Sequence, residues 1–214
     1  EYWRGRLDQT WNKAYALILN CNKILETIDD NQHLFTGGSY YVVKGEALAL
    51  RAMLHFDMLR LFGPVYSKDS DKKAIPYYTK QTNTPEPILT AEEVAGQVAA
   101  DLEDARTLLA NDPVKTEGTL MSGAQDGTSN FMRYRALRLN YYAVEALLAR
   151  VYLYMGDKKD AFKYASDVIK TADNGIFPFV DKSLVTGSPA DPDRIFSSEV
   201  IFALTNTSRG TIYK

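Results

Sequence analysis

One run of sequence decides the fold: GEALALRAMLHFDMLRLFGP, residues 45–64. At about 100° per residue, its apolar side chains fall into two stripes on nearly opposite sides of a helix. A surface helix needs only one stripe, so two opposed stripes require neighbouring elements on both sides. We therefore expect this helix, which begins near Tyr41 and ends at Gly63-Pro64, to lie inside a layered helical array. The stripes are Val43, Ala47, Leu50, Leu54, Met58 and Leu61, and Leu48, Ala52, Phe56 and Leu59.

Charged residues on this helix have little solvent to face. A charge that loses water must find a partner. We therefore expect Glu46 and Arg51 to bridge to neighbouring helices or loop carbonyls, with ligand contact as the alternative. The same expectation holds for Glu145 and Arg150 in a later apolar helix. His55 shares a polar seam with Arg51 and fits packing or hydrogen bonding better than metal binding.

Further elements follow in both directions along the chain. Thr90 and Glu93 form a capping box, in which each side chain satisfies the other residue's free backbone N–H. Loops rich in Pro, Gly or polar residues separate the helices. A connection as long as the one at 63–88 is often functional. The pattern predicts helices at about 7–28, 41–62, 90–109, 133–155 and 158–171, loop insertions at about 63–90 and 111–132, and a little β-structure at 199–204.

The last two predicted helices have the spacing of a tetratricopeptide (TPR) unit. Leu147, Tyr152, Gly156 and Ala161 fall where such a unit places Leu, Tyr, Gly and Ala. Gly156 permits a tight turn, and Ala161 lets the second helix pack closely on the first. We predict a mainly all-α fold of TPR-like stacked helix pairs in a single domain, 1–214. Both ends look cut, so we expect a fragment of a longer chain.

Composition restricts the function. The 214 residues carry a net charge of −2, which gives no reason to expect nucleic acid as a partner. The one cysteine, Cys21, sits among apolar residues and is expected to be a buried thiol. The sequence contains no HExxH, GxSxG, GxxxxGK[ST] or GxGxxG motif. We therefore expect no enzyme, no cofactor and no metal site; Asp69-Ser70-Asp71 and Asp191-Pro192-Asp193 are expected to be solvated loops.

Sugar binding would need aromatic faces flanked by polar side chains. The best local match is Tyr2-Trp3-Arg4, ahead of the first helix, and the first loop insertion adds Tyr66, Tyr77 and Tyr78. These six residues are the candidate ligand-binding residues. The alternative for each aromatic residue is packing against the helical stack.

Four stretches resemble one protein family. GEALALRAMLHFDMLRLFGPV (45–65) is similar to the core helix of the SusD/RagB-like proteins, and WNKAYALILNCNKILETI (11–28), residues 142–169 and SEVIFAL (198–204) follow the same family in order. The resemblance spans nearly the whole chain. It implies the TPR-like helical part of a glycan-capturing lipoprotein on the cell-surface side of the outer membrane of Bacteroidetes.

The resemblance also implies a function. Proteins of this kind capture an oligosaccharide or other nutrient without making or breaking a bond, and hand it to a SusC-like TonB-dependent transporter during polysaccharide utilisation. Their membrane association is through a lipid anchor, which is absent from these residues. The family's ligand contacts come from variable loops, so no site residue carries over by name. The alternative function is a TPR-type scaffold that binds a protein or peptide in a groove.

Overall fold

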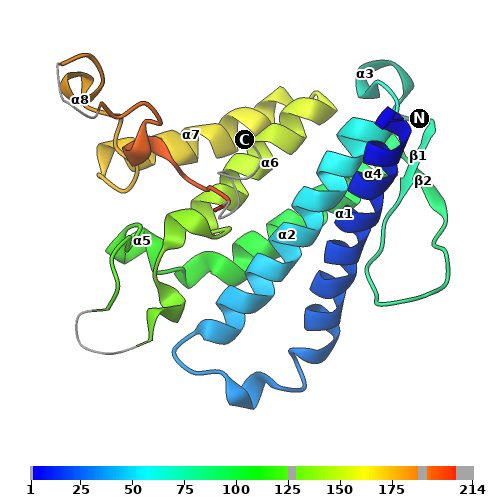
Figure 1. Ribbon diagram of the computed structural model, residues 1–214, viewed down its shortest axis with the longest axis horizontal. Helices are drawn as coiled ribbons and strands as arrows, with labels where there is room; N and C mark the ends of the chain where they lie inside the picture. The colour runs from blue at the N-terminus through cyan, green and yellow to red at the C-terminus, as the bar shows by residue number, and fades with distance from the viewer. Residues whose placement is uncertain (1, 125–128, 188–191, 206–214) are drawn as a thin grey trace.

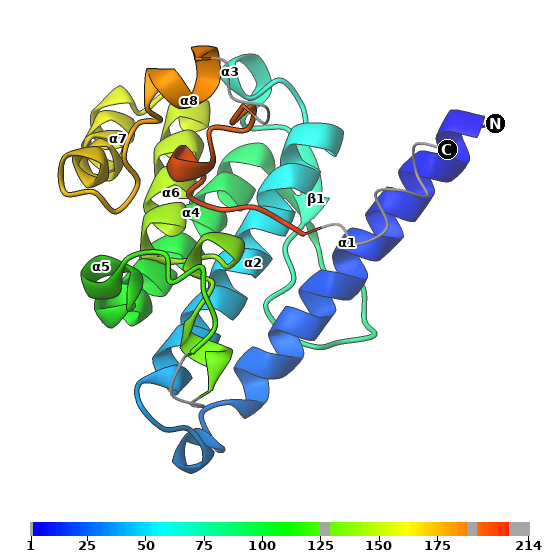
Figure 2. The ribbon, with the colours of Figure 1, turned by 60° about the vertical axis from the view of Figure 1, so that its left-hand side comes forward.

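The computed structural model describes residues 2–124, 129–187 and 192–205, without the side chains of residues 2–4. Within these ranges the fold is mainly α-helical with a small two-stranded sheet (Figure 1). In chain order the five long helices pack each on the next, so that α1 and α7 lie at opposite edges of the array (Figure 2). Among the described helices, none is long and apolar enough to cross a membrane. The long helices are α1 (Tyr2–Thr27), α2 (Ser39–Phe62), α4 (Ala91–Leu108), α6 (Tyr141–Met155) and α7 (Lys158–Asp173).

Helix α2 lies inside the array, as its two stripes predict. It packs against α1 on one side and α4 on the other. Ala49, Ala52 and Leu59 are fully buried, and Phe56 and Met58 nearly so. The stripe prediction is wrong at one end, because Leu61 is 60% exposed. This residue borders an open groove between α1 and α2 rather than a packed interface.

Gly45, in the second turn of α2, allows α4 to approach closely. A Cβ atom at Gly45 would lie 2.7 Å from Leu109 Cγ and 3.2 Å from the carbonyl oxygen of Ala105. Only a residue without a side chain fits there. Gly45 therefore sets the spacing between α2 and α4.

The first insertion has more structure than the sequence predicts. It contains the short helix α3 (Tyr66–Asp69) and a small antiparallel sheet of β1 (Lys73–Pro76) and β2 (Ile88–Thr90). The strands pair Lys73 with Thr90 and Pro76 with Ile88. The prediction of an irregular stretch is wrong here because the two pairing segments are separated along the chain and each is too short to show a period. The predicted capping box is confirmed, since Thr90 Oγ1 accepts from Glu93 N and Glu93 Oε2 accepts from Thr90 N.

Two other predictions differ from the structure. Helix α6 begins at Tyr141 rather than near residue 133, because Asn140 caps it through a bond from Ala143 N, and Tyr134 has a left-handed backbone with φ of 55°. The β-structure expected at 199–204 is also wrong. The 3₁₀ turn η5 (Ser197–Glu199) opens this segment, and residues 200–205 form no strand. Ala203 N instead donates a single backbone hydrogen bond to Ala136 O.

Helices α6 and α7 form the predicted pair. Gly156 joins them with a φ of +85°, a conformation that suits glycine, and Ala161 is buried against α6. The remaining elements are short. They are α5 (Val114–Glu117), α8 (Lys182–Thr186) and the 3₁₀ turns η1 (Gln32–Leu34), η2 (Leu109–Asn111), η3 (Asn130–Met132) and η4 (Arg135–Leu137).

Candidate ligand site

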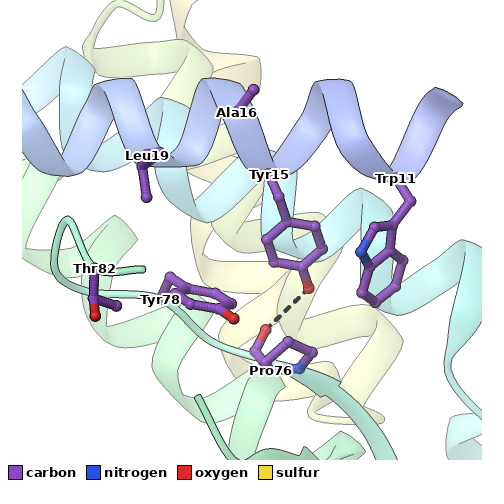
Figure 3. A pocket seen from close by; sticks show the side chains of 7 residues that line it. All are labelled: Trp11, Tyr15, Ala16, Leu19, Pro76, Tyr78 and Thr82. Carbon is purple, nitrogen blue, oxygen red and sulfur yellow. Dashed lines mark hydrogen bonds between the residues drawn. The ribbon is translucent and has the colours of Figure 1, made fainter. Parts of the chain in front are cut away.

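An open pocket with a volume of about 280 Å³ lies between α1 and the chain that leaves β1 (Figure 3). We call it the aromatic pocket. Three aromatic rings contribute to its lining, and no Lys, Arg, Asp or Glu does. The lining residues are Trp11, Tyr15, Ala16, Leu19, Pro76, Tyr78 and Thr82.

The helical period of α1 places Trp11, Tyr15 and Leu19 on one face, because they are four residues apart. The ring centroids of Trp11 and Tyr15 are 4.6 Å apart, with the planes at 40°. Tyr78 approaches from the other wall, with its centroid 5.6 Å from that of Tyr15 and the planes at 74°. Phe62 of α2 contacts Trp11 in an edge-to-face arrangement, with 5.0 Å between the ring centroids. All three rings of the pocket are partly exposed.

Neutral hydroxyl groups supply the polar chemistry of the pocket. The Tyr15 hydroxyl donates to the carbonyl oxygen of Pro76 at 3.1 Å (Figure 3). The Tyr78 hydroxyl accepts from Glu86 N at 3.3 Å, which leaves its own hydrogen free to donate. Burial, together with the nearby Tyr78, raises the pKa of Tyr15, so this phenol stays protonated. Such a surface can stack on the apolar face of a sugar ring and exchange hydrogen bonds with its hydroxyls.

The structure separates the predicted tyrosines. Tyr78 lines the aromatic pocket, whereas its neighbour Tyr77 points the opposite way into the core, as alternate residues of an extended chain do. The Tyr77 ring stacks on His55 at 3.8 Å and donates its hydroxyl hydrogen to Asp101 Oδ2 at 2.6 Å. Burial and the nearby Asp101 carboxylate raise the pKa of Tyr77 well above its usual value.

Of the other four candidates, the structure describes the side chain of Tyr66 alone. Tyr66 is on α3 and packs its ring against Tyr154 of α6, 4.9 Å between centroids, away from the pocket lining. Tyr2, Trp3 and Arg4 belong to the first turn of α1, and their side chains lie outside the described part of the chain.

Sequence reasoning missed Trp11 and Tyr15 as site residues. Trp11 is an apolar position of the first predicted helix, where a large residue is expected to pack against a neighbour. The available signal was the aromatic pair Trp11 and Tyr15 at positions i and i+4 of one predicted helix, together with the tyrosines of an insertion about 50 residues further along the chain. Which helix face that insertion covers depends on tertiary packing, so the pattern alone could not assign the pair to a pocket.

The buried charges join separate elements. Arg51 of α2 binds Asp101 of α4, and Glu145 of α6 accepts from Arg106 of α4 at 2.9 Å. Arg150 is exposed and forms no ion pair within the described residues.

A second charge cluster surrounds Arg135, whose side chain is completely buried. Its Nε and Nη2 atoms bind the two carboxylate oxygens of Asp112 at 2.9 and 2.6 Å, and its Nη1 binds Glu46 at 2.7 Å. Arg138 adds a second cation beside Glu46, at 2.5 Å. Glu46 of α2 is therefore tied to the segment ahead of α6.

Metal-binding side chains do not gather in the described residues, where no group of three or more His, Cys, Asp or Glu could hold an ion. Asp69 ends α3 and Asp71 follows it, both outside any such group. Asp191 lies outside the described residues. Cys21 is buried, and burial raises the pKa of its thiol.

Comparisons with known proteins agree with this architecture. The solved structures include a SusD superfamily protein from Bacteroides thetaiotaomicron, 25% identical with a TM-score of 0.69, covering 92% of this chain and 39% of that one. A SusD superfamily protein from Bacteroides vulgatus is 25% identical with a TM-score of 0.63, covering 87% of this chain and 40% of that one. A SusD-like carbohydrate-binding protein from B. vulgatus is 25% identical with a TM-score of 0.59, covering 78% and 31%.

The chain thus spans two fifths or less of the length of these three solved proteins. No curated protein matches it. A model of the SusD-like family, described as starch-binding and associating with the outer membrane, matches residues 2–124, more than half of the sequence. The chain belongs to this SusD-like family.

Proposed function

We propose that this protein binds an oligosaccharide non-covalently in the aromatic pocket. The observation that carries the proposal is the arrangement of Trp11, Tyr15 and Tyr78 around one open hollow. Pyranose rings present apolar C–H faces that pack on aromatic side chains, and their hydroxyls need neutral donors and acceptors. The description of the family as starch-binding and the carbohydrate-binding relative from B. vulgatus support the same ligand class.

The pocket is suited to binding rather than catalysis. Hydrolysis of a glycosidic bond generally requires a pair of carboxyl groups that flank the bond. The lining of the aromatic pocket contains no carboxyl group. The protein accordingly holds its ligand unchanged and releases it unchanged.

We further propose that the protein works on the cell-surface side of the outer membrane, attached through a lipid anchor. Its partner would be a SusC-like TonB-dependent transporter that takes up the captured nutrient. The family description, which names association with the outer membrane, supports the location. The transporter partnership rests on the resemblance of the sequence to SusD/RagB-like proteins.

Calorimetric titration with a panel of oligosaccharides tests the binding proposal. We expect at least one neutral oligosaccharide to bind, and Trp11→Ala to weaken that binding about tenfold, which is the loss of about 1.4 kcal/mol expected for one stacking ring. Trp11→Phe keeps a ring and should lose less. Phe162→Ala is the matched control, because Phe162 is an aromatic residue 74% exposed on α7, away from the pocket. Equal affinities of the wild type and Trp11→Ala would overturn the assignment of the pocket.

One observation favours a second candidate, a TPR-type scaffold for a protein partner. The outer side of the α6–α7 pair carries an open apolar groove, bordered by Leu153 and Phe162, which are 63% and 74% exposed. A partner held there should lose affinity in Phe162→Ala and keep it in Trp11→Ala, the reverse of the result expected for a sugar. The two variants therefore distinguish the two functions.

A further inference from the structure

The chain that forms one wall of the aromatic pocket is held in an unusual way. Residues 76–81, which we call the anchored segment, run beside α1 after β1 ends at Pro76 (Figure 3). Side chains of α1 and α2 bind six of its backbone groups. They are Tyr15 with Pro76 O (3.1 Å), His55 with Tyr78 N (3.1 Å), Asn22 with Tyr78 O (3.0 Å) and Lys80 O (3.2 Å), Arg51 with Thr79 O (3.3 Å), and Glu26 with Gln81 N (2.7 Å).

His55 is fully buried, with an exposed fraction of 0%. Its Nε2 atom accepts from the backbone N–H of Tyr78, and its Nδ1 atom is 2.9 Å from the carbonyl oxygen of Arg51. A carbonyl oxygen can only accept, and a backbone N–H can only donate. The imidazole must therefore be neutral, with its hydrogen on Nδ1. Burial lowers the pKa of His55 to about 3, which keeps this state over the usual pH range.

Asn22 of α1 binds the anchored segment through the carbonyl oxygens of that segment. It is fully buried, and its amide nitrogen donates to two carbonyl oxygens of the anchored segment, while its Oδ1 accepts from Arg51 Nη1 at 3.0 Å. His55 and Asn22 thus hold the N–H and the C=O of the same residue, Tyr78. Fixing both groups fixes the direction of the Cα–Cβ bond, and with it the wall from which the Tyr78 ring enters the pocket.

We infer that His55 and Asn22 are positioning residues. By binding the backbone of the anchored segment, they hold the Tyr78 ring in its place in the aromatic pocket. The hydrogen bonds of His55 and Asn22 to the backbone of Tyr78 are the contacts described above. Their effect on sugar affinity rests on the proposed function. The anchored segment also uses the buried donors and acceptors that a foreign peptide would need along this side of α1 and α2.

Two substitutions at one position test the inference. The side-chain oxygen of His55→Gln can accept at the place of Nε2, whereas His55→Leu removes the acceptor. We expect the exchange of the Tyr78 amide hydrogen with deuterium to become at least tenfold faster in His55→Leu and to stay near the wild-type rate in His55→Gln. His33→Gln, which changes the other histidine, exposed in η1, is the matched control and should alter nothing.

Nitrogen NMR of the wild-type imidazole gives a second, independent readout. We expect the His55 ring to carry its hydrogen on Nδ1 and none on Nε2, so this measurement decides the matter even if His55→Leu does not fold. Protonated Nε2, or equal Tyr78 exchange in a folded His55→Leu and the wild type, would overturn the inference.

The oligosaccharide titration separates this inference from the proposed function. If the wild type binds sugar, His55→Leu should bind about tenfold more weakly and His55→Gln nearly as well as the wild type. If the wild type binds no sugar while the exchange of the Tyr78 amide responds as expected, the proposed function is wrong, and the positioning of the anchored segment by His55 is retained. If sugar binds equally to a folded His55→Leu, the positioning role fails alone.

Discussion

Arg51 and Asp101 form a bidentate pair between α2 and α4, with Nε to Oδ2 and Nη2 to Oδ1 both at 2.7 Å. Tyr77 donates to the same Oδ2 atom, and Asn22 accepts from the remaining nitrogen of the guanidinium. Three helices and the anchored segment therefore meet in one buried network. Desolvation costs such a network free energy, and the paired hydrogen bonds offset that cost only while every partner is present.

Asp101→Asn should therefore be strongly destabilising. It leaves the buried Arg51 guanidinium without its counter-charge, and breaking a buried pair of this kind costs about 3–5 kcal/mol in the free energy of unfolding. Urea unfolding, followed by circular dichroism, measures the loss. Asp104→Asn on the same helix is the control, because Asp104 is exposed, and its change should stay within about 0.5 kcal/mol. Similar stabilities of the two variants would show that the pair contributes little.

Replacement by alanine should have opposite effects at two glycines, Gly156 in the turn between α6 and α7 and Gly96 within α4. Gly156→Ala places a Cβ atom on a residue with φ of +85° and should lower the free energy of unfolding by about 1–2 kcal/mol. Gly96→Ala should raise it by about 0.5–1 kcal/mol, because Gly96 lies within α4 and a Cβ atom there meets nothing within 4 Å. Thermal unfolding of the two variants should show midpoints that move in opposite directions from the wild type.

Gly45→Ala tests the close approach of α2 and α4. The added methyl group overlaps Leu109 and the carbonyl oxygen of Ala105, so we expect a loss of about 1–3 kcal/mol. The comparison with Gly96→Ala removes the general gain in helix propensity. A Gly45→Ala variant as stable as Gly96→Ala would mean that α4 moves away at no cost.

The buried His55 predicts how stability depends on pH. Its pKa is about 3 in the folded chain, against about 6.5 for an unfolded histidine, so the unfolded state binds more protons between these values. The free energy of unfolding must then fall as the pH falls through this range. Between pH 7 and pH 5 this contribution amounts to about 2 kcal/mol.

His55→Gln lacks the titrating ring and isolates this contribution. Urea unfolding at pH 7 and pH 5 should show a larger loss for the wild type than for the variant. His33→Gln should keep the wild-type dependence. Parallel pH profiles of the wild type and His55→Gln would contradict a buried neutral imidazole.

The features that the sequence predicts correctly are local ones. The two stripes of α2, the Thr90 capping box and the Gly156 turn each depend on residues a few positions apart, so a helical period or a cap residue reveals them. The pairing of β1 with β2 depends on segments that are far apart along the chain, and the left-handed backbone of Tyr134, ahead of α6, is an irregularity. Neither leaves a period in the sequence.

The candidate site divides in the same way. Tyr78 was predicted from the tyrosines of the first insertion, but nothing local shows that it lines a pocket while Tyr77 enters the core. The direction of each ring depends on His55 and Asn22, which lie 23 and 56 residues away along the chain. Trp11 and Tyr15 were missed because the other wall of their pocket, in residues 76–82, comes from the same distant insertion.

The Arg135 cluster has a consequence for the connection between α4 and α6. Asp112 and Arg135 form an ion pair at the two ends of the segment 113–134. Glu46 of α2 binds the same Arg135 side chain. The positions of the helices therefore do not depend on how many residues lie between Asp112 and Arg135. Doubling the number of residues between them would cost only about 0.6 kcal/mol in loop-closure entropy, so insertions here should cost the helices little stability.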